Sequence, residues 1–286
     1  MHVRWKLELR LISLVCLCVT SISAFAAVAG AKDLVVNVIS VGHGDAILIE
    51  FPGGETMLVD GGGPSAGDQV FDFIAEFGYT RIDYMVMTHA HDDHVGGLIS
   101  VVGNLKVGEL WTSEYADLTP VYLDFASRTE KEGIPVTIVA RGDSFQIGGV
   151  TVAVLNPPRG SSLNQLGGSN GASIVLRLTY GATSVLLAGD IDSSRDQELV
   201  VLYGDRLQST VLKCGHHGSD VSSSEEFLNA VDPAAAIVST GPSQYGYPSP
   251  ATMARIERLV PHVYRTDRDG TIVVTMDRTE FTVEIR

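Results

Sequence analysis

The sequence predicts an α/β protein built as a four-layer αββα sandwich, in which two sheets pack face to face between outer helices. Apolar runs of strand length alternate with amphipathic segments of helical length from about residue 33 onward. The chain divides into two halves that each supply strands and helices, and no clear linker separates them. Several strands end in turns rich in glycine, histidine or aspartate. We therefore expect one domain, residues 30–286, with functional residues at strand ends.

Length and charge narrow the class of protein. A chain of 286 residues, 45% of them apolar, is long enough to bury a sizeable core. The formal net charge is -14, so the protein has no general attraction for nucleic acid or for an anionic membrane.

The first 29 residues are predicted to be a signal peptide that is removed, so we expect a periplasmic or secreted protein without an integral membrane domain. A basic start precedes an apolar stretch over 11–29 whose last part is rich in alanine. The alternative is a retained membrane anchor, because the stretch is nearly long enough to span a bilayer. Cleavage would leave Cys214 as the one cysteine, so no intrachain disulfide is expected.

The first half is predicted to be a run of strands that leads into alternating helix and strand. Short apolar runs predict strands over 33–41, 46–51, 56–59, 84–87, 109–112, 136–139, 144–147 and 150–155. An amphipathic helix precedes the fourth strand, with Val70, Phe71, Ile74 and Phe77 on its apolar face. Further helices are expected over 95–103 and 120–132.

A polar loop rich in glycine, serine and asparagine, residues 159–171, marks the predicted boundary between the halves. The second half is predicted to contain strands over 173–178, 184–187, 210–213, 234–239, around residue 263, and over 272–276 and 281–285. Its helices are expected over 193–202, 223–230 and 252–259.

Residues 88–97 form the densest group of metal-ligand side chains in the chain, and they follow the predicted strand at 84–87 directly. His89 and His91 are two residues apart, so in an extended segment they point the same way and can bind one metal. The turn that follows brings Asp93 and His94 toward a second metal. Imidazole together with carboxylate suits zinc, manganese or iron rather than calcium.

Three further strand ends carry residues of the same kind. Asp60 precedes three glycines, Asp190 follows Ala188-Gly189, and His216-His217 lie between two glycines. Asp190 also precedes a predicted helix, so it is expected to be an N-cap as well. We predict that Asp190 bridges two metals and that His216 or His217, preferably His217, completes the second one.

The motif at 89–94 resembles the HxHxDH signature of the metallo-β-lactamase superfamily. Within that superfamily, six segments resemble the ComEC-type metallo-hydrolase domain of competence proteins: VGHGDAILIEFPGG, MLVDGGG, THAHDDHVGG, SIVLRLTYGATSVLLAGDI, VLKCGHHGS and VYRTDRDGTIVV. The resemblance covers nearly all of residues 33–286. It implies a metallo-β-lactamase-like fold, two divalent metal ions (zinc or manganese) and phosphodiester hydrolysis. It does not extend to the membrane channel of competence proteins, so it does not imply DNA transport.

The chain departs from the ComEC-type pattern at two places and from the wider superfamily pattern at a third. His43 stands where the family commonly has glutamine, and Tyr247 stands where many members have histidine. The superfamily's third histidine for the first metal is missing, with only Asn170 and Ser173 near its place. The first metal is therefore expected to have more positions open to water or substrate oxygen.

These residues predict an exported metal-dependent hydrolase, a phosphodiesterase or nuclease that uses two metals and a bridging hydroxide. The predicted catalytic carboxylates are Asp60, Asp93 and Asp190, with Asp60 orienting a metal ligand or a water. The predicted substrate contacts are Lys213, Ser219, Tyr247 and Arg265. The substrate is expected to be a small-molecule or nucleic-acid phosphodiester.

Two other functions fit the same residues. A lactone, ester or β-lactam hydrolase would use the same metals, and a non-catalytic metal-binding module is the second alternative. Cys214 is interpreted as a buried packing residue rather than as a nucleophile.

Overall fold

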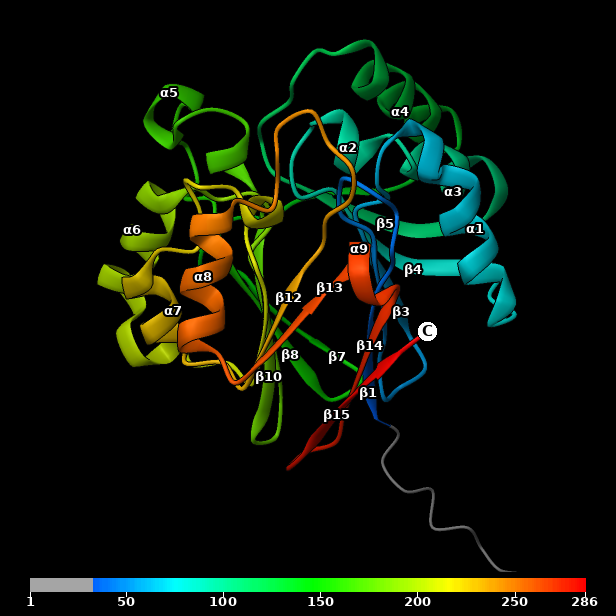
Figure 1. The fold of residues 1–286 in the computed structure, drawn as a ribbon. Helices are drawn as coiled ribbons and strands as arrows, with labels where there is room; N and C mark the ends of the chain where they lie inside the picture. The colour runs from blue at the N-terminus through cyan, green and yellow to red at the C-terminus, as the bar shows by residue number, and fades with distance from the viewer. Residues whose placement is uncertain (1–32) are drawn as a thin grey trace, which may run out of the picture. The chain divides into compact units, whose positions relative to one another are not determined.

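Two stacked sheets form the centre of the structure, a computed structural model that describes residues 33–286 (Figure 1). The predicted signal peptide lies outside the described residues. The first sheet has the strand order β15-β14-β1-β2-β3-β4-β5-β6. Its strands are β1 Leu34–Val38, β2 Ile47–Glu50, β3 Thr56–Val59, β4 Arg81–Val86, β5 Lys106–Thr112, β6 Val136–Ile138, β14 Ile272–Met276 and β15 Phe281–Ile285.

The second sheet has the order β13-β12-β11-β10-β9-β8-β7. Its strands are β7 Ser144–Ile147, β8 Val150–Asn156, β9 Val175–Tyr180, β10 Thr183–Leu187, β11 Val211–Lys213, β12 Ala235–Val238 and β13 His262–Arg265. Every residue of the central strands β3, β10, β11 and β12 is buried, because each sheet is covered on both faces.

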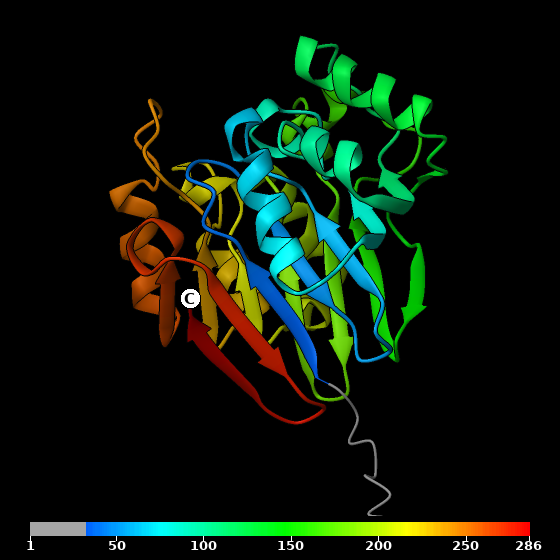
Figure 2. The same cartoon turned by 90° about the vertical axis from the view of Figure 1, so that its right-hand side faces the viewer.

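Helices cover the outer face of each sheet, as the two views in Figures 1 and 2 show. The first sheet packs against α1 Gly67–Glu76, α3 Leu98–Asn104 and α4 Pro120–Lys131, and the second against α6 Ser193–Tyr203, α7 Glu225–Val231 and α8 Pro250–Leu259. One apolar core lies between the sheets, and one lies under each helical layer. The predicted four-layer αββα sandwich is therefore confirmed.

The division between the halves differs from the prediction. The first sheet ends at β6, and the chain crosses to the second sheet before β7, so β7 and β8 belong to the second sheet. The loop over 159–171 instead connects β8 to β9 within that sheet, and it contains the short helix α5 Leu163–Leu166. The last two strands return to the first sheet, where β14 pairs with β1. Non-local pairing of this kind leaves no local signal in the sequence.

Local differences from the prediction have identifiable causes. The helix after the motif is divided into α2 Asp92–Val95 and α3, with Gly96 and Gly97 between them. Phe77 is 39% exposed because it caps the C-terminal end of α1, where the Arg286 guanidinium covers its ring. The N-cap of α6 is Asp192, whose side chain accepts hydrogen bonds from the backbone of Ser194 and Arg195, so Asp190 is not the cap.

Parallel pairing places several strand ends on one edge of the sandwich. Strands β3 to β6 are mutually parallel, and so are β10 to β13. The carboxyl ends of parallel strands meet at a common edge, which is where open α/β sheets bind ligands. The residues predicted to bind metal follow β4, β10 and β11 at this edge.

Candidate metal centre

The candidate ligands are held by tight turns that follow the strands. Asp60, His216 and His217 all have positive φ angles, of 58°, 47° and 52°. Such backbone conformations cost about 1–3 kcal/mol each in residues other than glycine, and they concentrate at functional sites. Gly44 allows a further close approach, because a Cβ there would lie 2.1 Å from the carbonyl oxygen of Asp93.

Four donor atoms from three turns converge tightly, and we call His94, His217, Asp93 and Asp190 the closed half of the centre. His94 Nε2, His217 Nε2 and Asp190 Oδ2 form a triangle with sides of 3.3, 3.4 and 3.2 Å. Asp93 Oδ2 lies 3.4 Å from His217 Nε2. Ligands held about 2.0–2.1 Å from a tetrahedral zinc lie about 3.3–3.4 Å apart, so the three atoms of the triangle have the mutual spacing of metal ligands, and Asp93 Oδ2 lies at that distance from His217.

Hydrogen bonds to the Nδ1 atoms of His94 and His217 orient the two rings so that their Nε2 atoms face Asp190. His217 Nδ1 donates to the carbonyl oxygen of Ser239 at 3.0 Å, so its Nε2 is the free acceptor. His94 Nδ1 lies 2.8 Å from Asp60 Oδ2, and Asp60 also accepts from the backbone nitrogen and the hydroxyl of Thr88. A carboxylate behind an imidazole orients a metal ligand. Asp60 is completely buried, so it contacts His94 rather than a water in the cavity.

A buried ion pair lies behind His217. The Lys213 ammonium contacts Asp45 directly, and both residues are at most 2% exposed. Asp45 Oδ1 lies 3.5 Å from His217 Nδ1. Burial lowers the pKa of Lys213, but the nearby carboxylates, Asp45 first, raise it by more than burial lowers it. The net shift is upward, and the lysine stays charged.

The structure places three of the four predicted substrate contacts away from the lining of the cavity. Lys213 is buried against Asp45 and does not reach the cavity. Ser219 is fully buried. Its carbonyl oxygen accepts a hydrogen bond from the Thr252 hydroxyl, so this residue holds the turn after β11 in place. The Arg265 guanidinium pairs with Asp267 at 2.7 Å and is not among the residues that line the cavity. Tyr247 does line it.

A looser group of ligand-type side chains also lies near Asp190, and we call His89, His91, His216 and Asp117 the open half. His89 Nε2 and His216 Nε2 lie 4.0 and 3.9 Å from Asp190 Oδ2. His91 Nε2 lies 3.9 Å from Asp117 Oδ2, and these two side chains are 39% and 44% exposed.

The buried atoms in this region that lack hydrogen-bond partners among the described residues include His89 Nε2 and Asp190 Oδ1. A buried polar atom without a partner is costly, and a metal ion would satisfy both atoms. The place of the missing third histidine is filled by smaller groups. Ser173 Oγ accepts from the backbone nitrogen of Asp190 at 3.1 Å, and Asn170 Nδ2 lies 3.3 Å from His216 Nε2.

The charge of the centre favours a bound cation. Burial lowers the pKa of His94, but Asp190, Asp60 and Asp93 together raise it well above its ordinary value. Burial raises the pKa of Asp190, but His217 and His94 bring it well below its ordinary value. The pKa of Asp93 is also lowered, so Asp93 and Asp190 are ionised beside the imidazole nitrogens, which is the electrostatic environment of a divalent metal site.

Both halves open into one cavity of about 190 Å³. It is lined by residues of loops and short helices between the strands and of the loop before α8: His43, His91, Asp93, Asn170, Asp190, His216, Tyr245 and Tyr247. Cys214 lies behind the centre in the core under the second helical layer, where burial raises the pKa of its thiol to about 12. It is therefore a packing residue, as the sequence predicts.

An αββα sandwich with a histidine and aspartate centre at its strand ends defines a class of metal-binding hydrolase-like proteins. The chain belongs to the metallo-beta-lactamase superfamily, whose family model matches residues 39–241. It is 29% identical to ComE operon protein 3 of Bacillus subtilis over an alignment of 255 residues, and the match covers 83% of this chain and 32% of that protein. It is also 29% identical to Competence protein ComA of Neisseria gonorrhoeae, over 86% of this chain and 33% of that protein. The chain thus spans about a third of the length of these relatives.

Solved structures show the same fold at low sequence identity. The metallo-beta-lactamase fold protein YhfI from Bacillus subtilis matches with a TM-score of 0.54 and 13% identity, over 84% of this chain and 98% of that one. CmlA, a diiron beta-hydroxylase from Streptomyces venezuelae, matches with a TM-score of 0.53 and 16% identity, over 86% of this chain and 54% of that one. No helix among residues 33–286 has the length and hydropathy needed to cross a bilayer.

Several residues of the centre were not predicted from the sequence. Asp45, Ser239 and Asp117 were given no role, and His43 was noted only as a departure from the family pattern. The glycine turn around His43 and Asp45 was a usable signal, because its ligand-type side chains precede a buried strand. Ser239 contributes only its backbone carbonyl, which no residue type reveals.

Proposed function

We propose that this protein is a metal-dependent phosphodiesterase with two divalent metal ions, zinc or manganese, that share Asp190. The observation that carries the proposal is the unequal pair of ligand groups round that carboxylate. The closed half supplies three donors at mutual metal-ligand spacing, with Asp93 at that distance from His217, and the open half supplies donors that are farther apart and partly exposed. Exposed, widely spaced ligands leave coordination positions for a substrate oxygen.

The donor atoms divide between two ions. His94, His217, Asp93 and Asp190 would hold one ion, and His89, His91 and Asp190 would hold the other, with His216 and Asp117 close by. When bound, two such ions neutralise the charge of a phosphodiester and lower the pKa of water to about 7. About two ions per chain are expected by elemental analysis at saturating metal, and one or none in folded protein would contradict the dinuclear centre.

The chain's own residues position these ligands and the substrate. Asp60 and Ser239 fix the rings of His94 and His217, and the Lys213–Asp45 pair closes the centre from behind. Tyr247 lines the cavity where related proteins commonly have histidine, and we propose that its hydroxyl contacts an ester oxygen of the substrate.

The lining of the cavity favours a short substrate over a long nucleic acid. None of the eight described lining residues is lysine or arginine. The formal net charge of -14 adds no attraction for a polyanion. We therefore propose that the metals, rather than a basic track, bind one phosphodiester group.

A panel of substrates tests this proposal with the protein loaded with zinc or manganese. It contains small phosphodiesters, single-stranded DNA, a lactone and a cephalosporin, each also measured in chelator. We expect metal-dependent turnover of the phosphodiesters, with small ones preferred to DNA. Turnover of the lactone or the cephalosporin alone would replace the proposal with the ester or β-lactam hydrolase alternative.

We also propose that the protein is exported and that residues 1–29 are removed. The support is the basic start, the apolar stretch and the alanine-rich end of this segment. Sequencing of protein from outside the cytoplasm should give an N-terminus between Ala27 and Ala31. An intact Met1 in the membrane fraction would support a retained anchor instead.

A further inference from the structure

Three aromatic side chains from two separate segments form one wall of the cavity, and we call His43, Tyr245 and Tyr247 the aromatic wall. The centroids of the Tyr245 and Tyr247 rings lie 5.8 Å apart with an interplanar angle of 24°, which is a stacked arrangement. The His43 ring lies 5.6 Å from Tyr245 and 6.1 Å from Tyr247. All three distances fall in the range of aromatic contact.

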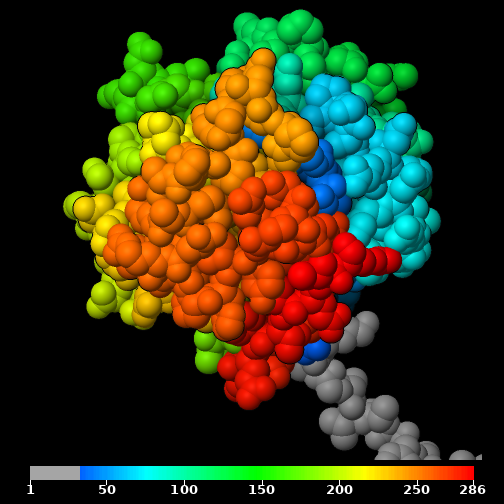
Figure 3. All heavy atoms as spheres, in the orientation of Figure 1, coloured from blue at the N-terminus to red at the C-terminus, as the bar shows by residue number. Residues whose placement is uncertain are grey.

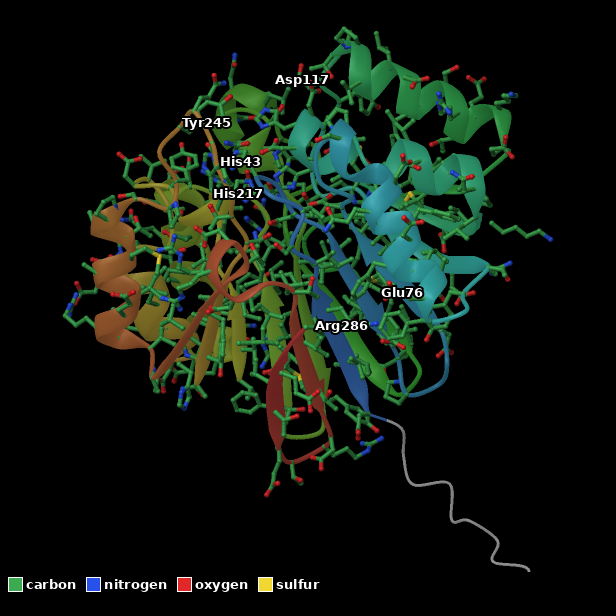
Figure 4. The ribbon with its side chains drawn as sticks, turned by 45° about the vertical axis from the view of Figure 1, so that its right-hand side comes forward. His43, Glu76, Asp117, His217, Tyr245 and Arg286 are labelled. Atoms are coloured by element: carbon green, nitrogen blue, oxygen red, sulfur yellow. The ribbon has the colours of Figure 1, made fainter. Side chains whose placement is uncertain are left out.

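The wall runs from the metal ligands out to the solvent. At its inner end, the His43 ring lies 4.5 Å from the His217 ring, and His43 Nε2 lies 3.2 Å from Asp93 Oδ2. At its outer end, Tyr245 is 61% exposed. Figure 4 shows His217, His43 and Tyr245 following one another outward. The segment over 242–249, orange in Figure 3, projects from the surface above the blue N-terminal residues.

This arrangement needs an explanation beyond the packing of the loop. Core aromatic residues are buried, whereas Tyr245 is exposed at the mouth of the cavity that contains the centre. Tyrosine presents a flat, rigid face at low cost in conformational entropy. Exposed aromatic side chains beside a charged site bind bases by stacking, without needing a particular base.

We propose that the aromatic wall is a stacking subsite for a planar ring on the substrate, of the nucleobase class. The subsite lies next to the metal centre, so the ring would belong to one ester group of the phosphodiester. The inference rests on the proposed phosphodiesterase function and deepens it, because it names a nucleoside phosphodiester as the substrate class. The aromatic wall would also help to bind the substrate in a cavity that has no lysine or arginine among its described lining residues.

The test compares two substrates that share a leaving group. Thymidine 5′-(p-nitrophenyl phosphate) carries a nucleobase, and methyl p-nitrophenyl phosphate does not. In Tyr245→Ala, kcat/KM for the thymidine ester should fall about tenfold, the effect of losing one stacked base. The value for the methyl ester should change less than twofold. Tyr245→Phe keeps the ring and should retain wild-type values for both, and the exposed Val201→Ala on α6 serves as an off-site control.

A binding measurement separates this inference from the proposed function. Metal-loaded wild type and Tyr245→Ala are titrated with thymidine 5′-monophosphate and with methyl phosphate. Tighter binding of the nucleotide that is lost in Tyr245→Ala supports the subsite, even if neither ester is hydrolysed and the phosphodiesterase proposal fails. Equal losses for the two p-nitrophenyl esters, or a nucleotide affinity that Tyr245→Ala leaves unchanged, would overturn it.

Discussion

The closed half and the open half of the metal centre share Asp190 but differ in how their ligands are held. His94 and His217 are buried, and each has its Nδ1 fixed by a buried acceptor. His91 and Asp117 are about two-fifths exposed and face each other across 3.9 Å. The closed half is thus pre-organised by the packing of both sheets, whereas part of the open half depends on exposed side chains.

This difference implies that the two proposed ions differ in affinity and in role. A pre-organised ligand set loses little entropy when it binds metal, so the closed half should bind more tightly. The open half should bind its ion more weakly and leave positions for the substrate. Four variants test this difference, in order of decreasing expected effect, and the first two are each paired with a control variant.

Asp190→Asn removes the carboxylate that the two halves share, and it should lower phosphodiesterase turnover by about 10²–10³-fold, the scale of losing one electrostatic contact in an active site. Metal content should also fall below two ions per chain. Because Asp192 is the cap of α6, the substitution does not affect the helix end. Turnover assays and elemental analysis measure the two effects.

Asp192→Ala is the matched control for that variant. Loss of the cap should cost about 1 kcal/mol of unfolding free energy and leave metal content unchanged. If Asp190→Asn hydrolyses a phosphodiester as fast as the wild type, the shared carboxylate has no role in the reaction.

Lys213→Met tests the support behind the closed half. It leaves the Asp45 charge buried without its partner, so the free energy of unfolding should fall by about 3–5 kcal/mol. Denaturant titration in chelator measures this without the stabilisation that bound metal contributes. Arg258→Met breaks the exposed pair with Glu225 and should cost less than about 1 kcal/mol. Equal costs for the two variants would contradict a buried, structural role for Lys213.

Asp60→Asn tests the orientation of His94. The amide keeps the shape of the side chain but weakens the hold on the ring, so affinity for the tightly bound ion should fall about 10–100-fold. Competition with a chromophoric chelator resolves the tight ion from the weak one. A loss confined to the weak ion would show that Asp60 does not support the closed half.

Asp117→Asn should have the smallest effect. An exposed carboxylate contributes about 0.2–1 kcal/mol, so affinity for the weakly bound ion should change less than about fivefold, with the tight ion unaffected. The same chelator competition measures it. A larger loss, or one that reaches the tight ion, would remove the distinction between the two halves.

The sequence predicted the elements better than their arrangement. Apolar runs gave the central strands close to their true bounds, because those strands are buried on both faces. The crossing to the second sheet before β7 and the return of β14 to β1 were missed, because strand pairing depends on contacts far apart in the chain. The split of the helix at Gly96 and Gly97 was a local signal that could have been used.

The centre shows the same contrast at the level of single residues. His89, His91, Asp93 and His94 could be predicted because they lie together in one turn. Asp45 could not be assigned a role, since its partner Lys213 lies 168 residues away. Lys213 was predicted to contact the substrate because a lysine is rarely buried unless it is paired, and the pair was not visible in the sequence.

The pairing of β1 with β14 has a consequence for the order of folding. Leu34 lies opposite Met276, so the first and last thirds of the chain meet inside one sheet across roughly 240 residues. Contacts of such long range form late and slow the search for the native state. Until β14 arrives, β1 presents an unpaired edge that another chain can bind. A chain interrupted before residue 272 would keep that edge, so the last fifteen residues are what cover the edge of β1, and β15 becomes the edge strand in its place.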